Sequence, residues 1–431
     1  MLCLSGSNGS KGLLGFYFGT SLVARILVAT ALGAAVGLAL GPQAAAVKPL
    51  GDLLLRLLRM IVVPVVFFSL VVGASSVSPS RLGSVGIKLI AYYTITTALA
   101  VTVGLLFANL LKPGLGLVLE GTGGATLSAT PPSLVETLLN VVPTNPVEAL
   151  AGGNMLQIIF FALLLGIGIS TLSESQDPRL SSAGQAVFKV CEGGAEAMYK
   201  ITKWIMEYAP IGVFALIATV FSQQGSKVAG PLAMALGTVY LAFGAHMVVI
   251  YGAALKAFGL NPLGFFRRAR EAMITAFVTR SSSATLPVTM EVSEEMLGVS
   301  KGIFSFTLPL GATINMDGTA IYQGVCVMFV ANCMGQALSL SQQLTVILTA
   351  TLASIGTAGV PGAGAIMLLM VLNSVGISVS EGTAAAAAYA MILGIDSIMD
   401  MGRTLLNVTG DMVGTVVVAK GEGELDGSKW D

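Results

Sequence analysis

The sequence predicts an all-α integral membrane protein, in which apolar helices cross the bilayer and two segments fold back within it. Of its 431 residues, 55% are hydrophobic and only 10% are charged, whereas soluble domains carry roughly 25% charged residues. Its mean hydropathy is +0.86. Uncharged stretches of about 18 residues or more, which is the length that spans a bilayer, recur along the chain. The longest of them contains a run of Gly and Pro that a helix does not continue through.

The composition argues against several functional classes. The 22 basic and 22 acidic residues balance, so the chain lacks the excess positive charge that would attract nucleic acid. His246 is the only histidine, and we expect it to be packed or hydrogen-bonded, because metal or triad chemistry would need partners that the sequence lacks. The cysteines have neither metal nor redox spacing, and we expect them to be small apolar fillers. They are Cys3, Cys191, Cys326 and Cys333.

The first two thirds of the chain predict six helices. Residues 1–15 are rich in Gly and Ser and resemble a short cytoplasmic tail rather than a cleaved signal peptide. Residues 113–146 are rich in Gly, Pro, Thr and Ser, which predicts a long loop with broken helix. We expect the second helix to begin near Leu53. The predicted helical stretches are 26–47, 60–80, 89–111, 149–173, 186–221 and 228–255.

Basic residues are distributed unequally between the two sets of loops. If each stretch crosses once, the loops after the second, fourth and sixth stretches lie on one side, and they hold more Lys and Arg than the opposite loops. The positive-inside rule then places the N-terminus in the cytoplasm. The first set is Arg81, Lys88, Arg179, Lys189, Arg267, Arg268 and Arg270, and the opposite set is Lys48, Lys112 and Lys227.

The last third contains two breaks. Residues 318–380 carry no charge, and the Gly- and Pro-rich run 353–364 lies in their middle. Backbone that leaves a helix at membrane depth must be buried in protein or line a cavity, so a re-entrant hairpin fits best. Residues 279–287 interrupt an earlier stretch in a similar way. Two units of hairpin followed by helix indicate an internal repeat, with a site where the units meet.

The last helix carries one polar stripe on an otherwise apolar surface. Its members fall at offsets of 4, 7, 11 and 15 residues, within roughly 80° of the helix circumference. Ionisable residues inside the membrane are expensive and are functional by default, although a structural ion-pair network between helices remains the alternative. The stripe consists of Asp396, Asp400, Arg403, Asn407 and Asp411, with Thr404 at its edge.

The chemistry of this stripe suits an acidic amino acid and a hard cation. Arg403 offers a planar fork of donors that matches a carboxylate, and Asp400 is able to accept hydrogen bonds from an ammonium group. Asn407 suits an α-carboxylate, and Asp411 suits an alkali cation. The segment 315–319, Asn-Met-Asp-Gly-Thr, contains Gly318, which we expect to unwind the helix so that carbonyl groups face a cation.

These residues resemble the glutamate transporter homologues, also called dicarboxylate/amino acid:cation symporters, and are most similar to archaeal sodium-coupled aspartate transporters. The resemblance is close over residues 260–425 and rests on long motifs. They are Thr279-Arg-Ser-Ser-Ser, Asn315-Met-Asp-Gly-Thr-Ala-Ile-Tyr-Gln323, the run 353–364, and Asp396-Ser-Ile-Met-Asp-Met-Gly-Arg-Thr-Leu-Leu-Asn-Val-Thr-Gly-Asp411.

The resemblance implies a homotrimer in the plasma membrane with both termini in the cytoplasm. Each protomer would have eight transmembrane helices and two re-entrant helical hairpins in inverted repeats, and would work as an elevator-type transporter. The implied division is a tail at 1–20, scaffold helices at 21–75, a transport-domain helix at 86–112, a loop and helices four to six at 113–255, with helix six partly in the transport domain, and a transport core at 260–425.

The resemblance also implies the ligand sites. Sodium ions would be co-transported with L-aspartate or L-glutamate, and Asp400 would bind the ammonium group and Arg403 the side-chain carboxylate of the substrate. The substrate residues would be Arg280, Ser281, Ser282, Met316, Thr319, Val360, Gly364, Asp400, Arg403, Thr404 and Asn407. One sodium site would use Asp411 with carbonyl groups of Gly311, Asn315 and Asn407. A second would use carbonyl groups of Thr313, Ser354, Ile355 and Thr357 near the Met316 sulfur. A third would use Tyr93, Thr96, Thr97, Asn315 and Asp317.

Some positions separate the alternatives. Gln323 stands where proton-coupled relatives carry Glu, and a neutral amide takes up no proton at working pH. Arg403 stands where carriers of neutral amino acids place a small residue. A proton-coupled dicarboxylate or glutamate symporter of the same fold and an uncoupled anion-conducting channel remain the alternatives. A hydrolase that uses Ser281–Ser283 lacks an adjacent His or Lys, so we expect no enzymatic activity. The sequence does not decide between aspartate and glutamate.

Overall fold

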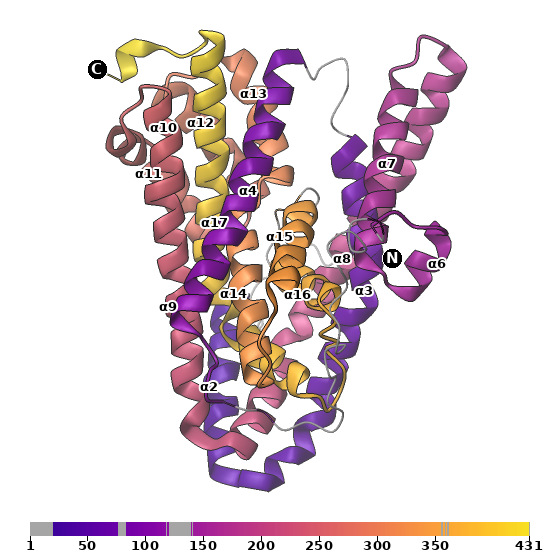
Figure 1. Cartoon of the computed structure of the whole chain (residues 1–431), viewed down its shortest axis with the longest axis vertical. Coiled ribbons are helices and arrows are strands. Elements are labelled where there is room, and N and C mark those ends of the chain that lie inside the picture. Colours follow the sequence, from indigo (N-terminus) through magenta and orange to yellow (C-terminus); the bar gives the residue numbers. More distant parts are fainter. Residues whose placement is uncertain are drawn as a thin grey trace, which may run out of the picture.

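The computed structural model describes residues 20–75, 83–117, 119, 139, 141–354, 357, 359 and 362–430, and every regular element among them is helical (Figure 1). The elements are α2 (Leu22–Leu40), η1 (Gly41–Val47), α3 (Lys48–Ser75), α4 (Gly83–Leu111), α6 (Pro146–Gly152), α7 (Met155–Ser173), α8 (Pro178–Gln224), η2 (Gly225–Val228), α9 (Ala229–Ala245), η3 (His246–Tyr251), α10 (Gly252–Ala257), α11 (Pro262–Thr279), α12 (Ser282–Glu295), α13 (Lys301–Ile314), α14 (Asp317–Cys333), α15 (Leu340–Ser354), α16 (Ala363–Ser374), α17 (Ala384–Glu422) and η4 (Gly427–Lys429).

Several of these helices begin at capping residues that the sequence displays. Asn145 and Asn261 accept hydrogen bonds from backbone N–H groups of the first turns of α6 and α11, and a proline follows each of them. Such a side chain satisfies donors that have no partner inside the helix. Ser281 caps α12 and Thr383 caps α17 in the same way. The helix starts are therefore set by local chemistry.

Four helical stretches of the described chain are long and apolar enough to cross a membrane: 24–75, 85–111, 178–257 and 384–422. The first and third contain 52 and 80 residues, far more than the roughly 20 that one crossing requires. Shorter apolar helices cover 157–173, 340–353 and 363–374. The chain is therefore a membrane protein of several apolar helices, as its composition predicts.

Some of the helical stretches differ from the sequence-based expectation. The second long helix begins at Lys48 instead of near Leu53, because η1 leads directly into α3. The stretch 149–173 is divided at Gly153, which adopts a left-handed conformation (φ 69°) that favours glycine. The stretch 228–255 contains a π-helical segment, η3, and a π-segment leaves no signature in hydrophobic periodicity.

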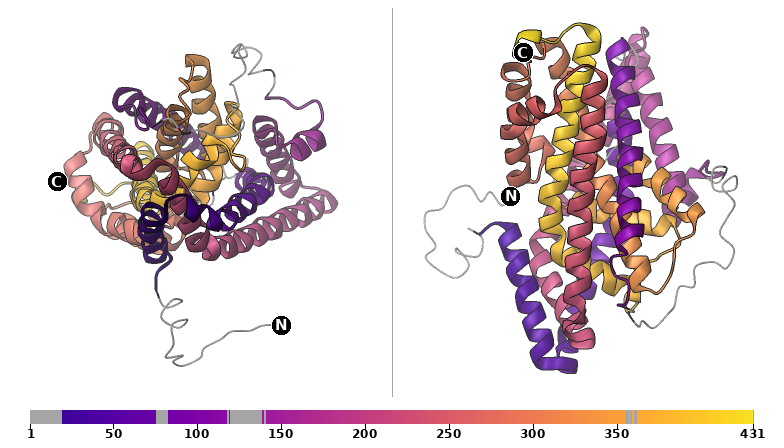
Figure 2. Two further views of the ribbon diagram at one scale, coloured as in Figure 1. Left: turned by 90° about the horizontal axis from the view of Figure 1, so that it is seen from below. Right: turned by 60° about the vertical axis from the view of Figure 1, so that its left-hand side comes forward.

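The helices form two groups that meet along one boundary. α8 packs against α2 and α3, and α3 packs against α7, and together they form the outer wall that Figure 2 shows from below. The other group is built around α14 and α17, which pack against each other and against α4, α11 and α13. α17 also touches α2 and α8, and α16 touches α3. The polar stripe of α17 thus lies in the middle of the molecule.

Two pairs of helices bring their connecting turns together. α11 packs against α12, and α15 packs against α16. The Ser281 hydroxyl donates a hydrogen bond of 2.7 Å to the Gly359 carbonyl, and the Ser283 N–H lies 3.4 Å from the same oxygen. The two Gly- and Ser-rich breaks of the sequence therefore meet each other next to α17.

Candidate functional site

The polar stripe of α17 is buried along its whole length. The exposed fraction is 5% or less for Asp396, Asp400, Arg403, Asn407 and Asp411. Burial without partners would cost several kcal/mol per charge, so the surroundings of each member are decisive. These surroundings differ along α17. One part of the stripe has guanidinium partners, and the other part has none among the described residues.

The first part is an ion-pair group around Arg403. The Arg403 Nη2 atom lies 2.5 Å from Asp400 Oδ1, and Nη1 lies 3.4 Å from Asp396 Oδ1. Arg280, at the turn between α11 and α12, places Nη1 3.7 Å from Asp400 Oδ2. The Arg403 guanidinium also lies over the Tyr322 ring, 4.6 Å from its centroid. Two guanidinium groups thus face two carboxylates here.

A small cavity adjoins this group, with a volume of about 10 Å³. Nine of the eleven substrate residues expected from the sequence line this cavity. The other two are Ser281, which bonds to Gly359, and Val360, which lies outside the described residues. The lining residues are Arg280, Ser282, Met316, Thr319, Thr357, Gly359, Ala363, Gly364, Asp400, Arg403, Thr404 and Asn407.

The α13–α14 break supplies another wall of the cavity. The helices end and restart at Asn315 and Met316, which have extended or irregular backbone. Asn407 of α17 ties this break to the stripe, because its Oδ1 accepts a 2.8 Å hydrogen bond from the Gly318 N–H and its Nδ2 lies 3.1 Å from the Met316 sulfur. Thr319 Oγ1 lies 3.4 Å from the same Nδ2.

Gly318 has a different role from the expected one. It belongs to the first turn of α14, and the break precedes it, so Gly318 does not unwind the helix. A Cβ atom at this position would collide with the backbone of Arg403. Glycine therefore permits the close approach of α14 to α17 that lets Asn407 reach its N–H group.

We expect Gly318→Ala to destabilise the protein by about 1–3 kcal/mol, because the added methyl group meets rigid backbone and forces the helices apart. The melting temperature of the detergent-solubilised protein measures this effect. Gly302→Ala in α13 is the matched control, since no atom lies within 4 Å of the added Cβ. Equal melting temperatures of the two variants would contradict the packing role.

The second part of the stripe is the surroundings of Asp411. Asn315 Nδ2 donates hydrogen bonds to Asp411 Oδ1 (3.0 Å) and to the Asn407 carbonyl (3.1 Å). A Cβ atom on Gly311 would lie 2.7 Å from Asp411 Oδ1 and 2.5 Å from the Tyr93 hydroxyl. The four residues expected to form the first sodium site are therefore neighbours, and their oxygens are the hard ligands that alkali cations prefer.

Asp317 is the centre of a neighbouring oxygen-rich group. Its Oδ1 accepts a 2.7 Å hydrogen bond from Thr97 Oγ1 and lies 3.4 Å from Thr96 Oγ1. Its Oδ2 lies 2.8 Å from the Tyr251 hydroxyl. Asp317 is completely buried. Within the described residues, neither Asp317 nor Asp411 forms an ion pair with Lys or Arg.

The remaining expected sodium site is less complete. The Thr313 and Thr357 hydroxyls donate to carbonyl groups of their own segments, Leu310 and Ala353. Ile355 lies outside the described residues, and Ser354 is the last residue of α15, with no described side chain. The described atoms of this set do not define a coordination site, and it stays a prediction.

Sequence reasoning did not identify Tyr322, Tyr251 and His246 as parts of the site. Tyr322 lies one residue before Gln323 in a helix that is buried on all sides, and nothing in its spacing shows that Arg403 lies over its ring. Both amide atoms of Gln323 lack a hydrogen-bond partner within the described structure. Tyr251 and His246 come from η3, whose π-helical geometry changes which residues face the interior.

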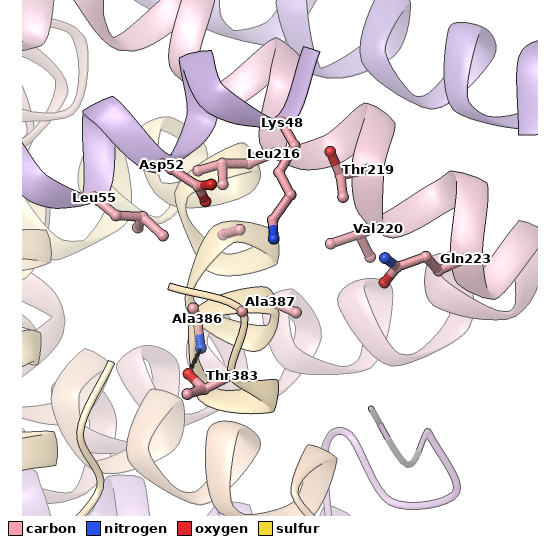
Figure 3. A pocket seen from close by; sticks show the side chains of 12 residues that line it. Lys48, Asp52, Leu55, Leu216, Thr219, Val220, Gln223, Thr383, Ala386 and Ala387 are labelled. Atoms are coloured by element: carbon pink, nitrogen blue, oxygen red, sulfur yellow. Dashed lines mark hydrogen bonds between the residues drawn. The ribbon is translucent and has the colours of Figure 1, made fainter. Parts of the chain in front are cut away.

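A larger cavity of about 270 Å³ lies at the boundary between the two helix groups (Figure 3). Lys48 and Asp52 of α3 and Gln223 of α8 line one wall, and Ala386 and Ala387 at the start of α17 line another. The loop before α17 is tied to α3 outside this cavity by a bidentate pair of Arg56 with Glu381. The hydrogen bond from Arg56 lowers the pKa of the exposed Glu381 carboxyl.

A small polar cavity between apolar helices is lined by paired charges and lies near two buried carboxylates that have no Lys or Arg partner among the described residues. This combination indicates a membrane protein that takes up a charged solute in its interior. This arrangement is typical of secondary transporters, whose sites lie where broken helices meet. Within the described residues, no group of three or more His, Cys, Asp or Glu side chains could hold a metal ion as a resident cofactor.

Comparison with known proteins agrees with this class. Residues 22–421 match the model of the sodium:dicarboxylate symporter family. The chain is 38% identical to the proton/sodium-glutamate symport protein of Bacillus caldotenax over 417 residues, 94% of this chain and 95% of the relative. It is 36% identical to the proton/glutamate-aspartate symporter of Escherichia coli (89% and 86% covered) and 32% identical to the C4-dicarboxylate transport protein of Bacillus subtilis (95% of both).

The chain belongs to the sodium:dicarboxylate symporter family. It is therefore a secondary symporter of the family that carries glutamate, aspartate and dicarboxylates, and it is not an enzyme. The family expected from the C-terminal motifs is confirmed.

Proposed function

We propose that this protein couples the inward movement of sodium ions to the uptake of an acidic amino acid, with aspartate as the preferred substrate and glutamate as a second one. One observation carries the proposal. Four buried carboxylates surround the site, and only two buried guanidinium groups accompany them. Asp317 and Asp411, which have no guanidinium partner among the described residues, contact neutral groups instead: the Thr97 and Tyr251 hydroxyls at Asp317 and the Asn315 amide at Asp411.

This charge balance supports bound cations. Counted as ionised, the site carries two excess negative charges, and an acidic amino acid adds one more. Each uncompensated buried charge costs several kcal/mol, so the substrate and the two carboxylates need cations as partners. Carboxylate and hydroxyl oxygens such as those of Asp317, Asp411, Thr96 and Thr97 suit a hard alkali cation better than a transition metal.

The substrate would replace the ion pair between Arg403 and Asp400. Its side-chain carboxylate would bind the Arg403 guanidinium as a bidentate partner, and its ammonium group would bind Asp400. The Asn407 Nδ2 group would donate a hydrogen bond to the α-carboxylate, close to the Ser281–Ser282 turn. Arg403 and Asp400 lie 2.5 Å apart, which supports this assignment. The positive group that a carboxylate requires and the negative group that an ammonium requires therefore lie side by side.

Coupling would arise from closure of the turn between α15 and α16. Gly364 lies against the Arg403 guanidinium, and the Gly359 carbonyl accepts a hydrogen bond from Ser281. Both glycines line the substrate cavity. Ligands shift such an equilibrium only through their differential affinity for its two states. Sodium and substrate together would favour the covered state.

Movement would follow an elevator mechanism in a homotrimer of eight-span protomers, with residues 21–75 in the static scaffold and residues 86–112 and 260–425 in the moving part. Both termini would lie in the cytoplasm. The cavity of Figure 3 supports a sliding boundary, because alanines of α17 face α3 and α8 across it. Small side chains present few ridges that would oppose sliding.

Proton-coupled symport is the second candidate, since related symporters are named for proton coupling. Gln323 argues against proton coupling, because an amide at this buried position takes up and releases no proton.

Uptake of labelled aspartate into proteoliposomes tests the proposal. We expect accumulation against the aspartate gradient with sodium outside and none with choline, because the cation sites remain unfilled. An imposed pH gradient without sodium should drive no uptake. Equal uptake in sodium and choline would reject sodium coupling, and failure to accumulate aspartate would indicate a channel. Competition by L-aspartate, D-aspartate, L-glutamate and serine ranks the substrates.

A further inference from the structure

His246 is a buried polar group that the proposed site does not use. It is the only histidine of the chain, its exposed fraction is 0%, and it begins the π-helical segment η3. No described group forms a full hydrogen bond with either ring nitrogen. Its Nε2 atom nevertheless lies 3.4 Å from Asp317 Oδ2.

The π-helical turn explains how His246 reaches this carboxylate. In an α-helix, residues five apart point about 140° away from each other. A π-turn closes its hydrogen bonds between residues five apart, so His246 and Tyr251 lie on the same face. Their rings meet edge to face, with centroids 4.8 Å apart and planes at 83°. The Tyr251 hydroxyl lies 2.8 Å from the same Asp317 oxygen.

The two oxygens of Asp317 therefore have different surroundings. Oδ2 faces the imidazole and the phenol of η3, whereas Oδ1 faces the Thr96 and Thr97 hydroxyls of α4. η3 packs against both α4 and α17, so it closes the side of the Asp317 group that lies opposite the threonines. A carboxylate held at one oxygen presents the other in a defined direction.

We propose that His246 is a positioning residue for the cation site, acting through Asp317. With cations bound, an N–H group on His246 Nε2 would close the 3.4 Å separation and donate to Asp317 Oδ2, and together with Tyr251 it would direct Oδ1 toward the Thr96 and Thr97 hydroxyls. The π-turn exists at this place because it brings both donors to one oxygen. This inference rests on the proposed sodium coupling and extends it to a residue outside the expected cation ligands.

A purely packed residue at this position would not need to be polar. An aliphatic side chain of similar size fills the same space without burying two ring nitrogens, and burial of polar atoms is unfavourable unless they have partners. The shared oxygen also predicts that His246 and Tyr251 act as one unit. Groups in one network have non-additive effects, whereas independent packing positions add.

The test compares His246→Leu, which removes the donor, with His246→Gln, which keeps an N–H donor. We expect His246→Leu to raise the sodium concentration for half-maximal aspartate uptake about fivefold or more, and His246→Gln to stay within about twofold of the wild type. The KM for aspartate at saturating sodium should change less than about twofold in both. Tyr251→Phe should raise the sodium requirement as well. The double variant should need no more sodium than the more impaired of the two single variants.

Tyr240→Phe is the matched control, because it removes a buried hydroxyl of the neighbouring helix α9, which donates to the Ile398 carbonyl 2.7 Å away and not to Asp317. It should leave the sodium requirement unchanged. An unshifted sodium requirement in His246→Leu, or additive effects of the two substitutions, would overturn the positioning role. Uptake by the wild type that does not depend on sodium would overturn the proposed function first, and this inference with it.

Discussion

Arg403→Cys should lose aspartate uptake and gain uptake of a neutral amino acid such as serine. The guanidinium is the only described donor that approaches both Asp396 and Asp400, at 3.4 and 2.5 Å. Without it, an acidic side chain would meet two carboxylates, and Arg280, whose Nη1 lies 3.7 Å from Asp400 Oδ2, would be the one guanidinium left beside the cavity. Removal of one member of a buried charge pair costs about 3–5 kcal/mol, which corresponds to an increase of about a hundredfold or more in the KM for aspartate.

Uptake of labelled aspartate and serine by the purified variant measures this prediction. Arg56→Cys is the matched control, because Arg56 is an exposed guanidinium that pairs with Glu381, and its removal should leave both uptakes near the wild-type values. Undiminished aspartate affinity in Arg403→Cys would show that the carboxylate of the substrate binds elsewhere.

Asp411→Asn should weaken sodium binding while leaving the substrate cavity intact. The substituted amide keeps the shape of the carboxylate but loses its charge. Asn315 Nδ2, which lies 3.0 Å from Asp411 Oδ1 in the wild type, would then face a neutral group. Loss of an interaction with a charged group costs roughly 1.5–3 kcal/mol. We therefore expect the sodium concentration for half-maximal uptake to rise about tenfold to a hundredfold.

Glu422→Gln at the end of the same helix is the control for this substitution, since it removes a carboxylate that pairs with Lys88 at 2.7 Å, away from the site. Its sodium titration should match the wild type. An unchanged sodium titration in Asp411→Asn would remove Asp411 from the cation site, and an increased aspartate KM at saturating sodium would assign it to the substrate instead.

Much of the site could be predicted from the sequence because it lies on one helix. The offsets of Asp396, Asp400, Arg403, Asn407 and Asp411 require one face of α17, and charges on an apolar helix require a polar interior. The structure places all five in the interior. The same holds for the two Gly- and Ser-rich turns, because backbone that leaves a helix inside a membrane must find partners in the protein.

Other features depend on contacts between segments that are distant in the sequence. Gly318 suggested an unwound helix. The structure shows instead that a side chain at this position would collide with the backbone of Arg403, 85 residues later in the chain. His246 suggested simple packing, and it lies beside Asp317 because η3 adopts a π-helical turn. Neither relation leaves a local pattern, since hydrophobic periodicity records only which face is buried.

The sequence by itself determined the membrane class, the symporter family and the helix that carries the charges, because composition, long motifs and helical spacing are local properties. Only the tertiary structure decided which carboxylates are paired. Arg403 and Arg280 reach Asp396 and Asp400, whereas Asp317 and Asp411 contact hydroxyl and amide groups and have no guanidinium partner among the described residues. Charge compensation in a buried site depends on distances of a few ångströms between separate helices, and those distances follow from packing.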